Sequence, residues 1–310
     1  MKYRRIGKTG LKVSEISIGG WLTYGRTVED NHTAKIIQKA VESGINFIDM
    51  ADIYATGESE LAIGKAIKPF TRSDLVLSSK LFWPMSKNVN DRGLNRKHIM
   101  ESVEKSLKRI GTDYLDLYFC HRYDKESETE ETVRAMDDLI RQGKILYWGT
   151  SVWDSKQINK AVNIAKQFGA YQPVVEQPRY NMIDRHIETE IMPTTTRHGI
   201  GLVVWSPLAQ GILTGKYNDG IPKNSRGSNE VFIQEDLTEK NIAKVRKLTK
   251  IADDAGVKLS HLAMAWCLRK KEISSIITGA SSLKQLQENL KVSEFKLTED
   301  LLKKVERIIG

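Results

Sequence analysis

Residues Leu75-Val76-Leu77-Ser78-Ser79-Lys80 decide the fold, because they form a short, largely apolar run that stops at a charged side chain. Strands buried on both faces of a parallel sheet have continuous runs of this kind. Leu202-Val203-Val204 repeats the pattern far along the chain. Besides Leu75–Ser79, the candidate strands are Val13–Ile18, Asn46–Asp49, Leu115–Cys120, Ile145–Gly149, Val174–Gln177, Leu202–Trp205 and Ser275–Ile277. The sequence therefore predicts eight strands.

Amphipathic segments between these strands predict helices. In Ile99–Ile110, Val103 and Leu107 recur at helical spacing, and Ala34–Val41 and Ile158–Ala165 follow the same rule. Alternating strands and helices predict a parallel sheet with right-handed crossovers, and eight such repeats close a barrel. The expected fold class is α/β, a (β/α)8 or TIM barrel.

Cap residues mark the expected helix ends. Asn95 precedes one helix, and Asp154 or Ser155 precedes another, where a polar side chain can accept a hydrogen bond from the first turn. Glycines stand between a helix and the next strand, where a left-handed residue often ends a helix. These glycines are Gly44, Gly143, Gly169 and Gly199.

An open, doubly wound sheet is the alternative fold. A nucleotide-binding sheet of that kind carries the pattern GxGxxG after its first strand. Here the first strand is followed by Gly19-Gly20-Trp21-Leu22-Thr23-Tyr24-Gly25, which does not fit the pattern. The barrel is therefore favoured.

Three segments lie outside the repeats. The first dozen residues predict a hairpin across Gly7–Gly10 that plugs the bottom of the barrel. Residues 207–237 form a long connection after the seventh strand, and loops of that length are usually functional. Leu297–Ile309 begins with a good helix start and predicts an extra C-terminal helix. We expect one domain spanning residues 1–310.

Composition excludes several classes of protein. The 310 residues carry a formal net charge of +9, but Lys and Arg are dispersed and no basic segment is interleaved with aromatics, so we expect no nucleic-acid partner. Cys120 and Cys267 are too few for a disulfide framework. The N-terminus has no apolar signal-like region, and no run of about 18 apolar residues occurs. We expect a cytoplasmic protein without a membrane span.

Four reactive side chains fall at consecutive predicted strand ends. Catalytic groups of a (β/α)8 barrel lie at the carboxyl ends of its strands. Asp49, Lys80 and His121 take such positions after the second, third and fourth strands, and Tyr54 follows Asp49 in the same loop. An ammonium lowers the pKa of a nearby phenol, and a carboxylate holds the ammonium in place. The set forms a general acid with an electrostatic clamp for a carbonyl oxygen.

Each of these residues taken singly has a structural reading. Asp49 could cap a turn, Tyr54 could be a rim aromatic, and His121 could be a satisfied structural histidine. Lys80 is harder to explain that way, since buried lysines are rare unless paired. A metal-dependent hydrolase lacks its ligands, because the remaining histidines fall in helices or loops away from strand ends. No metal is expected.

Several segments together resemble the aldo-keto reductase family. They are Phe47–Tyr54 with Gly57, Glu60 and Gly64, then Ser78–Lys80, Tyr118–Arg122, Gly149–Ser151, Val175–Asn181, Trp205–Gly211, Gly215–Tyr217, Gly279–Ser282 and Glu288–Asn289. The resemblance runs from about Tyr3 to Leu290. Trp205–Leu208 and Gly215–Tyr217 are most similar to the branch that holds the potassium-channel β subunits and their microbial oxidoreductase relatives.

The resemblance implies a role for each matching residue. Tyr54 would donate the proton, Asp49 and Lys80 would adjust the acidity of Tyr54, and His121 would orient the carbonyl group. The residues implied to contact a nicotinamide cofactor are Gly20, Trp21, Ser151, Gln177, Trp205, Ser206, Leu208, Gly211, Lys216, Arg226, Gly279, Ser281, Gln285, Glu288 and Asn289. The expected walls of the substrate pocket are Tyr24, Trp83, Arg122 and Trp153.

Arg226 and Val152 bear on how the cofactor is bound, and His121 bears on whether the protein is catalytically active. Arg226 resembles an arginine that approaches the 2′-phosphate, which implies NADPH, with NADH as the alternative. Val152 stands where many relatives carry Asn or Arg beside the carboxamide. His121 is retained where some channel-subunit relatives lack it, which favours catalysis.

The expected function is reduction of an aldehyde or ketone by an NAD(P)H-dependent oxidoreductase acting on a small-molecule substrate. The alternative is a regulatory subunit that binds the same cofactor, senses its redox state and turns over slowly. The branch resemblance also allows a homo-oligomer, although no apolar surface stripe marks an interface.

Overall fold

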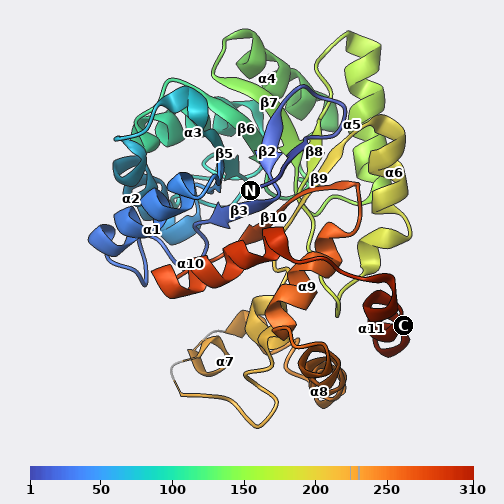
Figure 1. The fold of residues 1–310 in the computed structure, drawn as a ribbon. Helices are drawn as coiled ribbons and strands as arrows, with labels where there is room; N and C mark the ends of the chain where they lie inside the picture. Colours follow the sequence, from blue (N-terminus) through green and yellow to red (C-terminus); the bar gives the residue numbers. More distant parts are fainter. Residues whose placement is uncertain (224, 230) are drawn as a thin grey trace.

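A computed structural model describes residues 1–223, 225–229 and 231–310. Eight parallel strands close a barrel in the order β10-β3-β4-β5-β6-β7-β8-β9 (Figure 1). The barrel strands are β3 (Ile16–Gly19), β4 (Phe47–Asp49), β5 (Val76–Leu81), β6 (Leu115–Cys120), β7 (Ile145–Thr150), β8 (Val175–Glu176), β9 (Gly201–Val204) and β10 (Ile273–Thr278). The predicted (β/α)8 barrel is confirmed.

The first predicted strand was wrong in its extent. Val13–Ile18 is divided between β2 (Lys12–Ser14) and β3, with Glu15 between them. β2 pairs antiparallel with β1 (Tyr3–Arg5), whereas β3 pairs in parallel with β4 and β10. Glu15 therefore separates a strand of the antiparallel hairpin from a strand of the parallel barrel.

The N-terminal hairpin made by β1 and β2 closes one end of the barrel. In Figure 1 the hairpin lies in front of the barrel strands, beside the N-terminus. Ile6 and Val13, both fully buried, pack into one apolar cluster with inward-facing strand residues. Those residues are Phe47, Val76, Leu117, Phe119, Val175 and Val203. The predicted hairpin plug is therefore confirmed.

Helices surround the barrel (Figure 1). They are α1 (Asp30–Glu42), α2 (Glu58–Ile67), α3 (Arg96–Ile110), α4 (Thr129–Arg141), α5 (Ser155–Phe168), α6 (Ile191–His198), α7 (Arg226–Asn229), α8 (Glu239–Asp254), α9 (Leu259–Leu268), α10 (Leu283–Leu290) and α11 (Glu299–Ile309). The Asn95 side chain caps α3, and Asp154 forms a capping box at α5. The four predicted helix-ending glycines all have positive φ.

The long connection after β9 is built up in several pieces. It begins with a 3-10 segment, Ala209–Thr214, and continues through α7 and a short turn at Val231–Ile233 before α8 starts. Figure 1 shows α7 and α8 farther from the barrel than the other helices. The predicted C-terminal helix is α11, which begins after its cap residue Thr298. Among the described residues, no helix has the length and apolar character needed to cross a membrane.

Candidate active site

The closed barrel brings the four predicted catalytic side chains to one end. Asp49 is the last residue of β4, Lys80 lies near the end of β5, and His121 directly follows β6. β4, β5 and β6 are neighbours in the sheet, so their ends meet. Tyr54 starts a 3-10 turn after β4. Ala55, Thr56 and Gly57 after it are all left-handed, with φ of 49°, 54° and 95°. These residues form a tight turn, and α2 begins directly after them at Glu58.

Lys80 connects the phenol and the carboxylate. Its Nζ donates to Asp49 Oδ2 at 2.6 Å, to the Met50 main-chain oxygen at 2.7 Å and to the Tyr54 hydroxyl at 3.1 Å. These contacts occupy all three donors of the ammonium. The Lys80 side chain is fully buried, and that of Asp49 is 3% exposed. The ion pair is therefore shielded from solvent and holds Lys80 against Tyr54.

Asp49 is held by further donors from two other strands. Its Oδ1 accepts hydrogen bonds from Ser78 Oγ at 2.7 Å and from Gln177 Nε2 at 3.0 Å. Ser151 Oγ in turn donates to the Gln177 main-chain oxygen at 2.9 Å. Gln177 and Ser151, which the resemblance assigns to cofactor binding, therefore belong to the same network as the predicted catalytic carboxylate.

Electrostatics fix the protonation states of Tyr54 and Lys80. Burial raises the pKa of Tyr54, and the Lys80 charge lowers it without cancelling that rise. Burial alone lowers the pKa of Lys80, but the charge of Asp49 and the bonds to Asp49 and Tyr54 outweigh it, so that pKa is raised. Near neutral pH the site therefore holds a neutral phenol beside an ammonium. A phenol in that state has a proton to give.

His121 is neutral at the same pH. Burial first, and then the positive charges of Lys80 and Arg122, hold its pKa well below the usual range for histidine. Its ring meets that of Tyr54 edge-on, with centroids 5.9 Å apart. A neutral imidazole still carries one N–H, so His121 can donate a hydrogen bond to an oxygen placed beside Tyr54.

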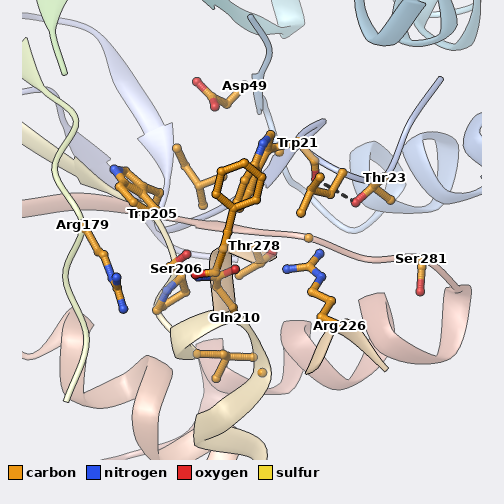
Figure 2. Close-up of a pocket in the computed structure, with 18 of the residues that line it drawn as sticks. Trp21, Thr23, Asp49, Arg179, Trp205, Ser206, Gln210, Arg226, Thr278 and Ser281 are labelled. Carbon is orange, nitrogen blue, oxygen red and sulfur yellow. Dashed lines mark hydrogen bonds between the residues drawn. The ribbon is translucent and has the colours of Figure 1, made fainter. Parts of the chain in front are cut away.

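A cleft of about 1350 Å³ opens above these residues. Most of the sequence-predicted site lines it, namely Trp21, Asp49, Tyr54, Trp83, His121, Arg122, Ser151, Gln177, Trp205, Ser206, Leu208, Gly211, Lys216, Arg226, Gly279, Ser281, Gln285, Glu288 and Asn289. Figure 2 shows Asp49, Trp21 and Trp205 toward one end, and Arg226 and Ser281 toward the other. The cleft thus extends well beyond the catalytic side chains.

Besides the fully buried Lys80, three predicted site residues do not line this cleft. Trp153 is 1% exposed and packs edge-on against Tyr123, so its indole is enclosed by protein. Tyr24 is fully buried, and its hydroxyl donates to the Ala280 main-chain oxygen. Tyr24 and Gly20 line a smaller adjoining pocket instead. The sequence placed these residues in the right loops but could not show which way they face.

The cleft also has walls that the sequence did not assign. Phe232 reaches it from the long connection and meets Trp21 edge-on, with ring centroids 5.7 Å apart. Gln210 Nε2 donates to the Phe232 main-chain oxygen at 2.9 Å, which ties the two parts of that connection together. Nothing in the local sequence predicts this, because the path of a long loop is set by distant contacts.

The chain was compared with known proteins. The sequence model of the Aldo/keto reductase family matches residues 15–309. The chain belongs to the aldo/keto reductase family. Members of this family bind NAD(P)H and small-molecule substrates, and the family supports an oxidoreductase class for this chain.

This aldo/keto reductase is similar to curated proteins over nearly its whole length. A probable voltage-gated potassium channel subunit beta of Arabidopsis thaliana is 46% identical, covering 100% of this chain and 97% of that protein. A protein of the same name from Oryza sativa subsp. japonica is 42% identical with the same coverage. A putative voltage-gated potassium channel subunit beta of Schizosaccharomyces pombe is 44% identical, covering 99% and 93%. The predicted branch is therefore confirmed.

Val152 of this aldo/keto reductase has an unfavourable backbone conformation. Its φ is 58°, a region that β-branched residues rarely adopt, and its side chain is 40% exposed. Asparagine tolerates this region better. We expect Val152→Asn to raise the free energy of unfolding by about 1 kcal/mol. Urea denaturation measures the change, and an unchanged or lower midpoint for Val152→Asn would contradict it.

Among the described residues, no group of three or more His, Cys, Asp or Glu side chains is arranged to hold a metal ion. Four of the other histidines lie in helices or turns, as the sequence predicted. His98 is in α3, His198 ends α6, His261 is in α9 and His186 starts a short 3-10 turn.

Proposed function

We propose that this aldo/keto reductase reduces aldehydes or ketones to alcohols with NADPH, and that Tyr54 donates the proton. The observation that carries the proposal is the buried hydrogen-bonded chain from Asp49 through Lys80 to the Tyr54 hydroxyl, which faces a large cleft. A phenol held beside an ammonium is suited to protonate an oxygen that becomes negative.

The cleft suits a dinucleotide together with a substrate. Its volume of about 1350 Å³ exceeds the range of roughly 300–1,000 Å³ typical of sites for one small ligand. Ser151 and Gln177 would hold the carboxamide, Trp205 would stack on the nicotinamide, and Ser206, Leu208 and Lys216 would contact the pyrophosphate. When bound, the reduced nicotinamide supplies the hydride.

The adenosine end of the cleft fits a polar, negatively charged group. A Cβ added to Gly279 would lie 3.7 Å from both Arg226 Nη2 and Thr23 Oγ1, so the bare Gly279 backbone faces these side chains. Ser281 lies at the start of α10, where helix N–H groups favour anions. Arg226 and this helix start support NADPH over NADH. Gln285, Glu288 and Asn289 would contact the adenosine.

The side chains of this chain would act in sequence on the substrate. The carbonyl oxygen would accept hydrogen bonds from the Tyr54 hydroxyl and from an N–H of neutral His121, which polarises the carbonyl group. Tyr54 would pass its proton to that oxygen as negative charge develops. The Lys80 ammonium would stabilise the resulting phenolate, and Asp49 would keep Lys80 charged and in place.

A turnover assay tests the proposal. Purified protein is mixed with NADPH and a panel of aldehydes and ketones, and the loss of reduced-nicotinamide absorbance is followed over many turnovers. We expect steady oxidation of NADPH that depends on carbonyl substrate, and slower oxidation of NADH under the same conditions. Consumption that stops after one equivalent of cofactor would contradict an enzymatic role.

The names of the three relatives favour a second candidate function. Each is named as a potassium channel subunit beta, so this chain could be a regulatory subunit whose bound cofactor reports redox state to a partner. Slow turnover, a tightly retained cofactor and a co-purifying partner would support that role.

We propose that the protein acts in the cytoplasm in either role. Light scattering would measure whether the chain forms a homo-oligomer.

A further inference from the structure

Arg122 stands at the reacting end of the cleft. It follows His121 at the end of β6 and lines the cleft with Tyr54. Its guanidinium carbon lies 5.6 Å from the centroid of the Trp83 ring, and the Trp83 ring lies 6.3 Å from that of His121. One aromatic side chain therefore borders both this cation and the histidine beside the proposed proton donor.

The Arg122 charge is not neutralised by a neighbour. Its one hydrogen bond to another described residue goes to the His121 main-chain oxygen, and no carboxylate of the described residues lies within ion-pair distance. The side chain is half-buried, and burial lowers its pKa. A partly desolvated cation without a counter-ion is unfavourable, so binding an anion there would be favoured.

Two other cations of the site differ from Arg122 in this respect. Lys80 is paired with Asp49 at 2.6 Å, and Arg179 contacts both Asp184 and Asp236. Glu176 influences Arg122 electrostatically, but its oxygens are taken by Thr150 and by main-chain N–H groups. Burial also raises the pKa of Glu176 to about 7, so it is only partly charged near neutrality. The binding capacity of Arg122 therefore remains available to a ligand.

One wall beside Arg122 is aromatic, because the guanidinium lies over the Trp83 ring, and Trp83 is 37% exposed. Trp21 and Phe232, which is 61% exposed, line the same cleft. A ligand body that covers such side chains gains from burial of apolar surface and from stacking. An aromatic wall beside a guanidinium suits an aromatic ring that carries one planar carboxylate.

We propose that Arg122 binds the carboxylate of the substrate, so that the preferred substrates are aromatic aldehydes bearing a carboxylate. This inference rests on the proposed reductase function. The guanidinium would pair with the carboxylate while the ring lies along Trp83 and the aldehyde oxygen reaches Tyr54 and His121. Arg122 then selects the substrate, and the Tyr54 group performs the reduction.

Matched pairs of substrates test this role. The probes are 3- and 4-formylbenzoate and their methyl esters, which differ by one charge while the reacting aldehyde is kept. For the better isomer we expect the wild-type kcat/KM to exceed that of its ester by at least about tenfold, since a charge-assisted hydrogen bond is lost in the ester. Arg122→Met should remove this preference, mainly by raising the KM of the carboxylates toward that of their esters.

Two further variants separate recognition from general charge. Arg122→Lys keeps the charge without the bidentate geometry and should keep only part of the preference. Lys125→Met removes an exposed charge from the same loop outside the cleft lining and should keep the whole preference. Equal loss in Lys125→Met and Arg122→Met would show that Arg122 acts only through net charge.

Calorimetric measurement of product binding tests the inference even if no turnover is observed. Binding of 3- and 4-(hydroxymethyl)benzoate, the expected products, is measured with oxidised cofactor present. We expect Arg122→Met to weaken the tighter of the two by about tenfold or more. Two results would overturn the Arg122 inference and leave the reductase proposal intact. One is that the wild type reduces the esters as well as the carboxylates, and the other is that Arg122→Met binds the products as tightly as the wild type. Failure of every aldehyde while carboxylate binding still depends on Arg122 instead overturns the proposed reductase function.

Discussion

Replacing Tyr54 by phenylalanine is expected to lower kcat by at least about a hundredfold, because general acid catalysis contributes roughly 10²–10⁴ in rate. Phenylalanine keeps the ring that meets His121 edge-on but lacks the hydroxyl that receives the Lys80 hydrogen bond. Most cofactor contacts proposed above lie elsewhere in the cleft. Affinity for NADPH should therefore stay within about twofold of wild type, since the loss is confined to the proton-transfer step.

The measurement combines steady-state kinetics with a fluorescence titration of NADPH. Tyr123→Phe is the matched control, because it removes one phenolic hydroxyl whose only hydrogen bond to a described residue is with Thr129, at 3.1 Å, and Tyr123 does not line the cleft. We expect Tyr123→Phe to reduce aldehydes at nearly the wild-type rate. If Tyr54→Phe did the same, Tyr54 would not be the acid, and the proton would have to come from His121 or water.

Much of the fold is predictable because most of the barrel strands are buried on both faces. Runs such as Leu115–Cys120 are short and largely apolar, and β6 has those bounds in the structure. The strand prediction was wrong where neighbouring residues are equally buried but belong to two different sheets. Val13 and Ile16 are both fully buried, yet Val13 faces the barrel interior from the hairpin and Ile16 belongs to the barrel. Which sheet a strand joins depends on distant partners, not on its own pattern.

The positions of the site residues at strand ends were predictable, whereas the orientations of those in loops were not. Asp49, Lys80 and His121 are fixed by the ends of adjacent strands, so a rule about strand ends brings them together. Trp153 and Tyr24 lie in loops, and an aromatic ring there can turn into the cleft or into the protein. Both turn inward, because Trp153 packs on Tyr123 and Tyr24 bonds to Ala280. Such orientations depend on packing that local sequence does not encode.

Replacing Lys80 by methionine is expected to abolish turnover and to destabilise the fold by roughly 3–5 kcal/mol, the usual cost of breaking a buried ion pair on one side. Asp49 would remain as a buried carboxylate whose hydrogen bonds from the described part of the chain come from Ser78 and Gln177. Tyr54 would lose the ammonium that stabilises its phenolate. Stability and catalysis should therefore fall together in this variant.

A double variant separates these two losses. Adding Asp49→Asn to Lys80→Met removes the uncompensated charge, so urea denaturation should recover a large part of the lost free energy of unfolding while turnover stays absent. Lys304→Met is the control, since its ion pair with Asp300 is exposed and should contribute at most about 1 kcal/mol. A free energy of unfolding for Lys80→Met within about 1 kcal/mol of wild type would mean that the ion pair contributes little to stability. Lys80 would then act only on Tyr54, and its ion pair with Asp49 would not stabilise this end of the barrel.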